Sequence, residues 1–395
     1  MESINHGLKR FTWFTAFSTL VLICFGGLVT SRGAGLSVPD WPNTYGYNLF
    51  FFPVSQWIGG IFYEHTHRLF AAWVGLLTAL LAVWLWARET RGRERTIGVL
   101  AILVAVLALG LRSMPVYLAM AAASAVVVVV GLWRFNRRPD QLRWLGLTAL
   151  GAVIAQGVLG GLRVTTLRDE IGVFHGLIAH LFLVLLTVIA VLLGSWWSGS
   201  AAANPVSARL RAWVAAGTLL ILGQLIMGAT MRHQHAGLAI PDFPLAHGRV
   251  WPDTSPEAVL RYNQERMELH AARPITAFQI QLQMAHRLGA LLVLLAVVAA
   301  VWRGRRELPS GHWLHRLHFM WLGLILLQCG LGALTIWTGK SADIATAHVA
   351  TGAVSLVVGT MAIMAGRRAI EGRHRVARSD SEAGGLMSVA AETTS

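Results

Sequence analysis

Charged and polar groups that could do chemistry gather at residues 64–68, where a long apolar run begins. Glu64, His67 and Arg68 lie within five residues of one another. Ionisable groups are costly at membrane depth, and so they mark a functional site by default. A second copy, with His286 and Arg287, opens another apolar run in the second half of the chain.

The two copies differ at the residue three positions before the histidine. The first copy has Glu64 and the second has Gln283. If the helix already begins before Glu64, its carboxylate shares a face with His67, where it could take up a proton or stabilise positive charge. The alternative is a simple ion pair with Arg68. The asymmetry predicts that the reaction takes place in the first half, with a fixed cofactor in the second.

Four of the 15 histidines occupy equivalent places in the two halves, each near the outer end of its expected helix: His67, His175, His286 and His348. A lone histidine in a helix usually packs or bonds to a neighbour, but these four recur in pairs. Two imidazoles at one depth can clamp a flat macrocycle from both faces, and imidazole is a common axial ligand of haem iron. Zinc would need further ligands, and no Cys or Asp occurs at that depth. One haem site in each half is predicted.

Arg68 and Arg287 directly follow two of these histidines. A guanidinium group there could bind a haem propionate through two hydrogen bonds. The alternative is contact with a lipid headgroup, as is common for arginines near helix ends.

The elements that must position these groups are membrane-spanning helices. Of the 395 residues, 55% are apolar and 13% charged, and the mean hydropathy is +0.56. The backbone must satisfy its own hydrogen bonds in lipid, and the short alternating strands of a barrel do not occur. About ten transmembrane helices are expected, of which 97–111 is the shortest: 11–31, 66–87, 97–111, 114–133, 144–164, 173–195, 208–230, 280–302, 317–338 and 345–366.

The net charge of +14 does not indicate a nucleic-acid partner, because most Lys and Arg residues fall on one side of the expected spans. This is the positive-inside pattern. It predicts a multi-pass protein of the inner (cytoplasmic) membrane with both termini in the cytoplasm, so that the four histidines lie near the outer face. Residues 11–30 resemble a signal peptide, but a counterpart deep in the chain argues against cleavage.

The chain also repeats itself. Residues 35–42 match 237–244, His67-Arg68 matches His286-Arg287, and residues 156–162 match 328–334. Two fused four-helix bundle repeats are therefore predicted, over 1–199 and 200–370. Changes in the offset place an inserted helical hairpin at 97–143 and a short outer helix at about 256–272, which begins after Ser255 as cap. The charged, polar segment 371–395 is predicted to be a disordered cytoplasmic tail.

Several of these motifs together resemble those of the haem A synthase family, which oxidises haem O to haem A for cytochrome oxidases. They are Glu64-x-x-His67-Arg68, the 35–42 loop, Gln156-Gly-x-Leu-Gly-Gly and the copies in the second half. The likeness covers nearly the whole chain apart from the hairpin and the tail. It implies a reaction in which a methyl group of haem O becomes a formyl group through successive hydroxylations, with water as the oxygen source.

The resemblance also implies roles for the residues. Haem O would lie in the N-terminal half between His67 and His175 with Arg68, and Glu64 would be catalytic. Haem b would be the cofactor of the C-terminal half, with His286 and His348 as ligands of the haem iron and Arg287 beside them. Many family members carry a cysteine pair in an outer loop, but residues 37–38 and 239–240 contain none. A thiol-dependent redox step is therefore not expected.

Two other functions fit parts of the pattern. A bis-histidine di-haem electron-transfer protein would use the same imidazoles without catalysis, although such carriers usually place haems near both faces. A transporter built from repeats would place its polar residues at the midplane rather than at one edge. The expected partners are membrane lipid, a second copy of the chain, haem O synthase at the hairpin, and a membrane electron acceptor that no motif identifies.

Overall fold

The computed structural model describes residues 5–111, 113–198, 206–268 and 274–392. In these ranges the regular structure is helical, apart from two isolated β-bridges. The bridges lie in the two loops that the sequence predicts to face the outer side, which keep the name outer loops below. Nine of the described helices are long and apolar enough to cross a membrane. The protein is therefore an all-α, multi-pass membrane protein, as the composition predicts.

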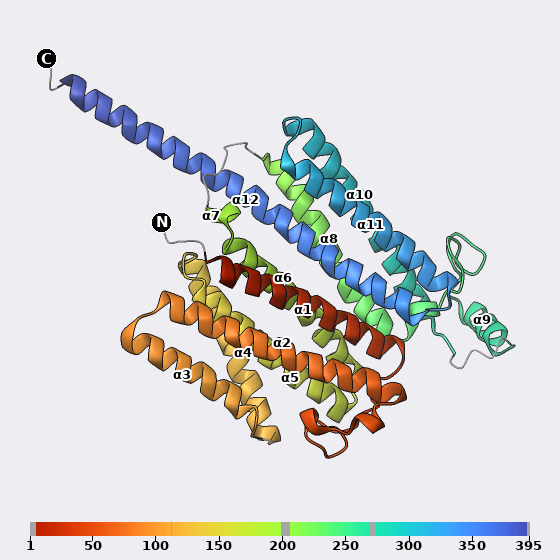
Figure 1. Ribbon diagram of the computed structural model, residues 1–395. Coiled ribbons are helices and arrows are strands. Elements are labelled where there is room, and N and C mark those ends of the chain that lie inside the picture. Colours follow the sequence, from red (N-terminus) through yellow and green to blue (C-terminus); the bar gives the residue numbers. More distant parts are fainter. Residues whose placement is uncertain (1–4, 112, 199–205, 269–273, 393–395) are drawn as a thin grey trace.

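Eight long helices form two bundles of four that lie side by side (Figure 1). The first bundle contains α1 His6–Ser31, α2 Gly59–Glu89, α5 Arg143–Thr166 and α6 Asp169–Leu192. The second contains α8 Ala208–His233, α10 Ala277–Glu307, α11 Trp313–Trp337 and α12 Ala342–Glu392. Helices α1 and α6 pack against α8 and α12, so that the bundles share one interface.

Several threonine hydroxyl groups inside these helices bond to the backbone of their own helix. In α1, the hydroxyl groups of Thr12 and Thr19 donate to carbonyl oxygens four residues earlier, at 2.8 and 2.9 Å. Helix α10 begins with a capping box, in which Thr276 and Gln279 bond to each other's backbone N–H groups. These hydroxyl groups therefore need no hydrogen-bond partner in the surrounding lipid.

The inserted hairpin consists of α3 Gly92–Ala108 and α4 Met114–Arg137. Helix α3 starts earlier than predicted and has 17 residues, a length of about 26 Å. Helix α4 packs closely on α5, because a Cβ atom at Gly151 would lie 2.9 Å from the carbonyl oxygen of Ser124. Small residues at such crossings let membrane helices approach each other. The hairpin is thus attached to the first bundle.

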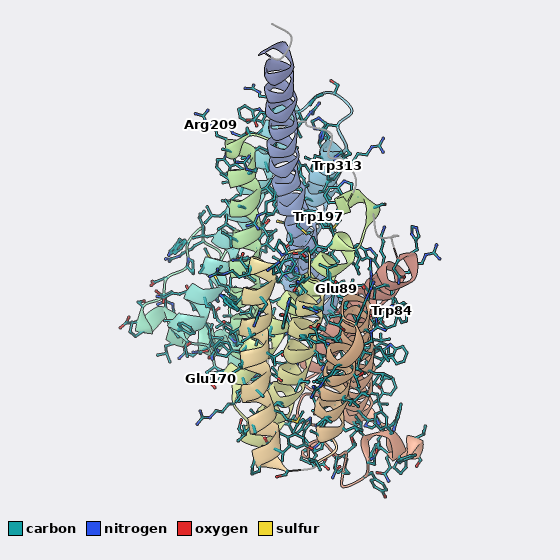
Figure 2. The ribbon with its side chains drawn as sticks, turned by 90° about the vertical axis from the view of Figure 1, so that its left-hand side faces the viewer. Trp84, Glu89, Glu170, Trp197, Arg209 and Trp313 are labelled. Atoms are coloured by element: carbon teal, nitrogen blue, oxygen red, sulfur yellow. The ribbon has the colours of Figure 1, made fainter. Side chains whose placement is uncertain are left out.

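The outer loops and the two chain ends lie at opposite ends of the molecule (Figure 1). Helix α9, Pro256–Glu268, confirms the predicted short helix of the second loop, and the Ser255 hydroxyl accepts a hydrogen bond from Ala258 N–H. Three single turns, η1 Leu49–Phe51, η2 Val54–Gln56 and η3 Ala236–Leu238, belong to the same end. In Figure 2, Arg209 and Trp313 lie toward the end from which α12 extends, and Glu170 lies toward the other.

The predicted disorder of the C-terminal segment 371–395 stays a prediction. Residues 371–392 continue α12 as helix beyond the bundle (Figure 1). This segment contains several Ala, Glu and Arg residues, which have high helix propensity. A four-residue helix, α7 Ser195–Ser198, ends the first half.

Candidate functional site

The two outer loops that precede the His-Arg pairs share the backbone structure of one turn segment, residues 40–47 and 242–249. In the first, the carboxylate of Asp40 accepts hydrogen bonds from Tyr45 N–H and Gly46 N–H, both at 2.8 Å. In the second, Asp242 accepts from His247 N–H and Gly248 N–H at 2.7 and 2.8 Å. Both loops also contain a cis X–Pro bond and one isolated β-bridge at matching positions.

Glu64 and Gln283 each hold the loop of their own half. Glu64 Oε2 accepts a hydrogen bond from Val38 N–H at 2.9 Å, and Gln283 Oε1 accepts from Ile240 N–H at 2.7 Å. Both side chains are buried, with exposures of 4% and 2%. Because α2 begins at Gly59, Glu64 already lies on the helix, as the prediction of a shared face with His67 requires.

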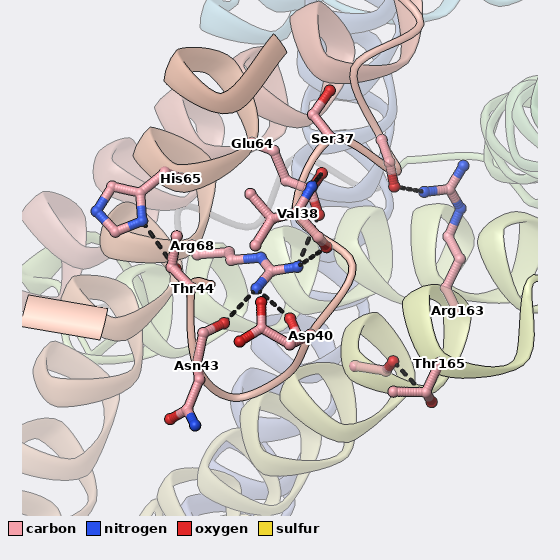
Figure 3. A network of polar contacts seen from close by, with 12 residues as sticks. Ser37, Val38, Asp40, Asn43, Thr44, Glu64, His65, Arg68, Arg163 and Thr165 are labelled. Carbon is pink, nitrogen blue, oxygen red and sulfur yellow. Dashed lines mark hydrogen bonds and ion pairs between the residues drawn. The ribbon is translucent and has the colours of Figure 1, made fainter. Parts of the chain in front are cut away.

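The two arginines bind the same loops from one turn further along, and Figure 3 shows the contacts of Arg68 in the first half. Arg68 Nη1 donates to the carbonyl oxygens of Asp40 and Asn43 at 2.7 and 2.8 Å, and its Nη2 donates to Val38 O at 2.9 Å and Glu64 Oε1 at 2.7 Å. In the second half, Arg287 donates to the equivalent carbonyl oxygens of Asp242 and Leu245.

These contacts assign the arginines a structural task that the sequence did not indicate. The four terminal N–H groups of Arg68 have four acceptors in the loop and Glu64, and so only its Nε–H remains for a propionate. The ion pair with Arg68, the alternative interpretation of Glu64, is present at 2.7 Å. The predicted propionate contacts and the catalytic role of Glu64 stay predictions.

Each of the four predicted histidines lies against a glycine of the adjacent helix. A Cβ atom added to that glycine would lie 3.2 to 3.4 Å from the imidazole Cε1 atom. A side chain there would crowd the ring, because this is tighter than ordinary contact between carbon atoms. The pairs are His67 with Gly26 of α1, His175 with Gly160 of α5, His286 with Gly228 of α8, and His348 with Gly332 of α11.

The imidazoles also have unused hydrogen-bonding capacity. In all four, Nδ1 is buried and has no hydrogen-bond partner among the described residues. A buried polar atom without a partner costs free energy. The ring centroids of His286 and His348 are 6.4 Å apart. With metal-to-imidazole bonds of about 2 Å, rings on opposite sides of one metal ion have centroids on the order of 6 Å apart. The second pair therefore fits bis-histidine binding of haem iron, and the first pair is packed in the same way.

Among the described residues, no three His, Cys, Asp or Glu side chains are grouped so that they could hold a metal ion. Each half thus offers an imidazole pair, which suits a metal whose other ligands come from a macrocycle.

The sequence did not identify the glycines as part of the site. Gly160 and Gly332 occur in the repeated Gln-x-x-x-Gly motif, but only as motif positions. Gly26 and Gly228 are separated by the same offset as the repeated outer loops. The shared offset could have identified these glycines, because a small residue at the same position of both repeats indicates that two helices approach closely there.

Aromatic packing beside the loops differs between the halves. Trp41 of the first loop contacts Tyr117 of the inserted helix α4, with ring centroids 4.5 Å apart. Its counterpart Phe243 contacts Trp337 of α11, whose indole N–H donates to Phe243 O at 3.2 Å. In the first half the inserted helix α4 thus contributes to the support of the loop, whereas in the second half the aromatic contact comes from α11, the counterpart of α5.

Arg232 joins the two halves near the outer ends of their helices. From α8, its Nη2 donates to Gly27 O of α1 at 2.8 Å and to Ser31 Oγ at 2.5 Å. Lys340, in the turn between α11 and α12, lies close to this cation, and burial lowers the pKa of its ammonium group, with a smaller contribution from the Arg232 charge.

Comparisons with known proteins agree with this arrangement. Residues 116–360, more than half of the chain, match the model of the COX15-CtaA family, described as cytochrome oxidase assembly protein. The chain is 22% identical to the haem A synthase of Geobacillus kaustophilus over 356 residues, which cover 87% of each chain. It is 26% identical to the haem A synthase of Shouchella clausii over 312 residues, covering 76% of this chain and 77% of the relative.

A third relative, the haem A synthase of Halalkalibacterium halodurans, is 25% identical over 353 residues, with 87% of this chain and 92% of the relative covered. The similarity therefore extends over most of the chain. The chain belongs to the COX15-CtaA family of cytochrome oxidase assembly proteins, whose curated relatives include haem A synthases.

Proposed function

We propose that this protein is a haem A synthase, which oxidises a methyl group of haem O to the formyl group of haem A for the assembly of terminal oxidases. One observation supports this activity in addition to the family membership. Two equivalent imidazole pairs occur side by side, and only the first follows a buried carboxylate by one helical turn.

In this proposal each half holds one haem. His67 and His175 bind the substrate, haem O, in the N-terminal half. His286 and His348 bind haem b in the C-terminal half, where the bound cofactor would supply one-electron transfer. The support is the common packing of the four rings against glycines and the unpaired Nδ1 atoms. Helices α1 and α6 pack against α8 and α12, so the two sites share a protein interface.

Glu64 is the proposed catalytic residue. Each of its carboxylate oxygens accepts one hydrogen bond, from Val38 N–H and from Arg68. An ionised carboxylate offers more acceptor sites than these two bonds use. It can therefore receive a proton released as the methyl group is oxidised, while both hydrogen bonds keep it oriented. Gln283 cannot accept a proton in this way at neutral pH.

The loop contacts support the same function by closing the site. Arg68 and Glu64 tie the 38–43 backbone over the start of α2, and Arg163 Nη1 donates to Gly35 O at 3.0 Å. A loop held by several charge-assisted hydrogen bonds limits the access of water to the groups beneath it. We further propose that these loops face the outer side of the cytoplasmic membrane, as the positive-inside pattern predicts.

One observation favours a second function, that of a di-haem electron carrier. Both halves contain the same imidazole and glycine pairs, which is what a carrier with two equivalent haems would need. Such a carrier would not require a carboxylate at Glu64 and an amide at Gln283. The haem A synthase relatives also favour the enzyme.

The deciding experiment is an absorption spectrum and a pigment extract of the purified full-length protein, from a host that makes haem O but lacks its own haem A synthase. We expect low-spin haem b together with haem O and haem A. Two b haems with no haem A, in protein that is folded and in a host with active haem O synthesis, would support the carrier and reject the enzyme.

A further inference from the structure

A cavity of about 270 Å³ lies in the second bundle, at the end opposite its imidazole pair. It is bounded by Val206, by the first two turns of α8 and α11, and by α12 at residues 362–367. Three of its lining side chains are basic or polar, namely Arg211, His318 and Arg367, and most of the others are apolar, including Leu210 and Ile363.

His318 is the unusual member of this lining. It is 2% exposed, and its Nδ1 atom is buried without a hydrogen-bond partner among the described residues. Burying an imidazole without a partner costs free energy, so another benefit must offset the cost. The ring packs against Gly304 of α10, where an added Cβ atom would lie 2.8 Å from Nδ1.

The first bundle fills the equivalent space without a polar group. By the repeat offsets, Gly304 corresponds to Leu85 and His318 to Gly146. There Leu85 of α2 packs against Gly146 of α5, and an added Cβ atom would lie 2.9 Å from Leu85 Cδ1. In the first half the large residue is on α2 and the glycine on α5, whereas in the second half the glycine is on α10 and the large residue on α11. Since leucine fills the space in one half, an imidazole is not needed for packing in the other.

The charges around this cavity favour an anion. Arg211 Nη1 donates to Val206 O at 2.6 Å, which holds the guanidinium group at the cavity and leaves other N–H groups for a ligand. Glu307 belongs to the same end of the bundle, but its carboxylate is bound by Ser207 Oγ and by Arg303 Nη1. No Asp or Glu is among the residues that line the cavity.

We infer that this cavity binds the phosphate group of an anionic phospholipid, with Arg211 and Arg367 as charged partners and His318 as a buried donor or acceptor. The apolar lining then contacts the upper part of the acyl chains. Basic pockets between membrane helices are suited to such headgroups, and arginine binds phosphate through paired hydrogen bonds. The inference is independent of the proposed haem chemistry, since the cavity lies at the other end of the bundle.

The test uses the full chain, purified in detergent and stripped of lipid. Binding of short-chain phosphatidylglycerol is measured by native mass spectrometry and by the shift of the thermal-unfolding midpoint. Phosphatidylcholine with the same chains and inorganic phosphate are the comparison ligands. We expect phosphatidylglycerol to bind at least about fivefold more tightly than phosphatidylcholine, and inorganic phosphate to give no shift at the same concentration.

The variants locate the site. Arg211→Gln and Arg367→Gln should each weaken phosphatidylglycerol binding about fivefold. His318→Leu should also weaken it, while the fold and the haem spectrum are kept, since leucine fills the matching space in the first bundle. Arg209→Gln is the matched control, because this exposed arginine lies two residues from Arg211 but does not line the cavity.

Three results would overturn the inference. One is equal binding of both lipids, and another is an equal loss of binding in Arg209→Gln and Arg211→Gln. The third is a stabilisation by inorganic phosphate as large as that by phosphatidylglycerol, which would show a site for free phosphate rather than for lipid.

Discussion

The two halves of this protein keep the same scaffold but differ where one side chain can change chemistry. The loops, the carbonyl-binding arginines and the four histidine and glycine pairs recur in both. The halves differ at Glu64 against Gln283 and in the support of each loop, and also in the inserted hairpin, helix α9 and the cavity of the second bundle. The positions around the four imidazole rings are thus shared between the halves, and the positions beside them differ.

The comparison also distinguishes two properties of Glu64, namely the hydrogen bond that anchors the loop and the negative charge. Gln283 accepts the same backbone hydrogen bond in the second half that Glu64 accepts in the first. A neutral amide is therefore sufficient to hold such a loop. The negative charge of Glu64 serves something else, either the pairing with Arg68 or the reaction.

The largest expected effect comes from removing an imidazole. His286→Ala or His348→Ala should abolish the low-spin haem b spectrum of the purified protein, because one axial ligand is lost. His67→Ala should instead keep that spectrum and lose haem A formation, which makes the two halves distinguishable by absorption and pigment extraction. If His67→Ala erased the haem b spectrum as well, the assignment of one haem to each half would be wrong.

Glu64→Gln should lower haem A formation by about a hundredfold or more, the usual effect of removing a positioned acid or base. The amide can keep the bond to Val38 N–H, as Gln283 does for Ile240, so haem content and detergent stability should remain close to those of the unchanged protein. The measurement is haem A per bound haem in pigment extracts.

The reciprocal variant Gln283→Glu is the control for that experiment. It places a carboxylate in the half proposed to hold the cofactor and should not create a second site of oxidation. Normal haem A production by Glu64→Gln would leave Glu64 with the anchoring role alone.

Smaller effects on haem binding are expected from substitutions of the glycines that contact the imidazole rings. Gly160→Ala places a Cβ atom 3.2 Å from His175 Cε1, so the ring must move by a few tenths of an ångström. We expect weaker retention of haem O at unchanged haem b content. Gly157→Ala lies on the same helix with no atom within 4 Å of the added Cβ, and should have no effect on haem retention. Equal losses in both variants would mean that α5 itself, rather than the ring contact, is disturbed.

The smallest expected effect concerns pH at the second loop. His247 Nε2 lies 3.1 Å from Ala239 O, and burial lowers the pKa of this imidazole below its ordinary value. The folded loop thus favours the neutral ring. The contribution of the neutral His247 ring to the stability of the folded loop should be fully present above the ordinary pKa of about 6.5. This contribution should decrease as the pH falls below that value.

Protease cleavage of the second loop should accordingly speed up between about pH 7.5 and pH 5.5, and the first loop has no histidine at the matching position. Tyr45 occupies the matching place there and bonds Ser37 O at 2.6 Å. His247→Tyr should remove the pH dependence. A pH response that persists in this variant would assign the effect to another group.

Much of the fold could be predicted from the sequence because apolar length and internal repetition are local signals. The spans, the outer helix α9 and the two His-Arg pairs follow from them. The tasks of Glu64 and Arg68 could not be predicted, because their partners are backbone groups of a loop 25 to 30 residues earlier in the chain. Gly26 and its equivalents were missed for the same reason, since a close approach to a ring depends on which helices become neighbours.

The bond between Arg232 and Gly27 connects residues 205 positions apart, and this separation affects how the protein is made. At about 5 to 20 residues per second, the ribosome needs on the order of 10 to 40 seconds to make that stretch. During this interval α1 is already synthesised, but the acceptors near its end have no guanidinium partner. Correct assembly of the first bundle against the second must therefore wait for insertion of α8. Chains truncated before this helix should be substrates for membrane quality-control proteases.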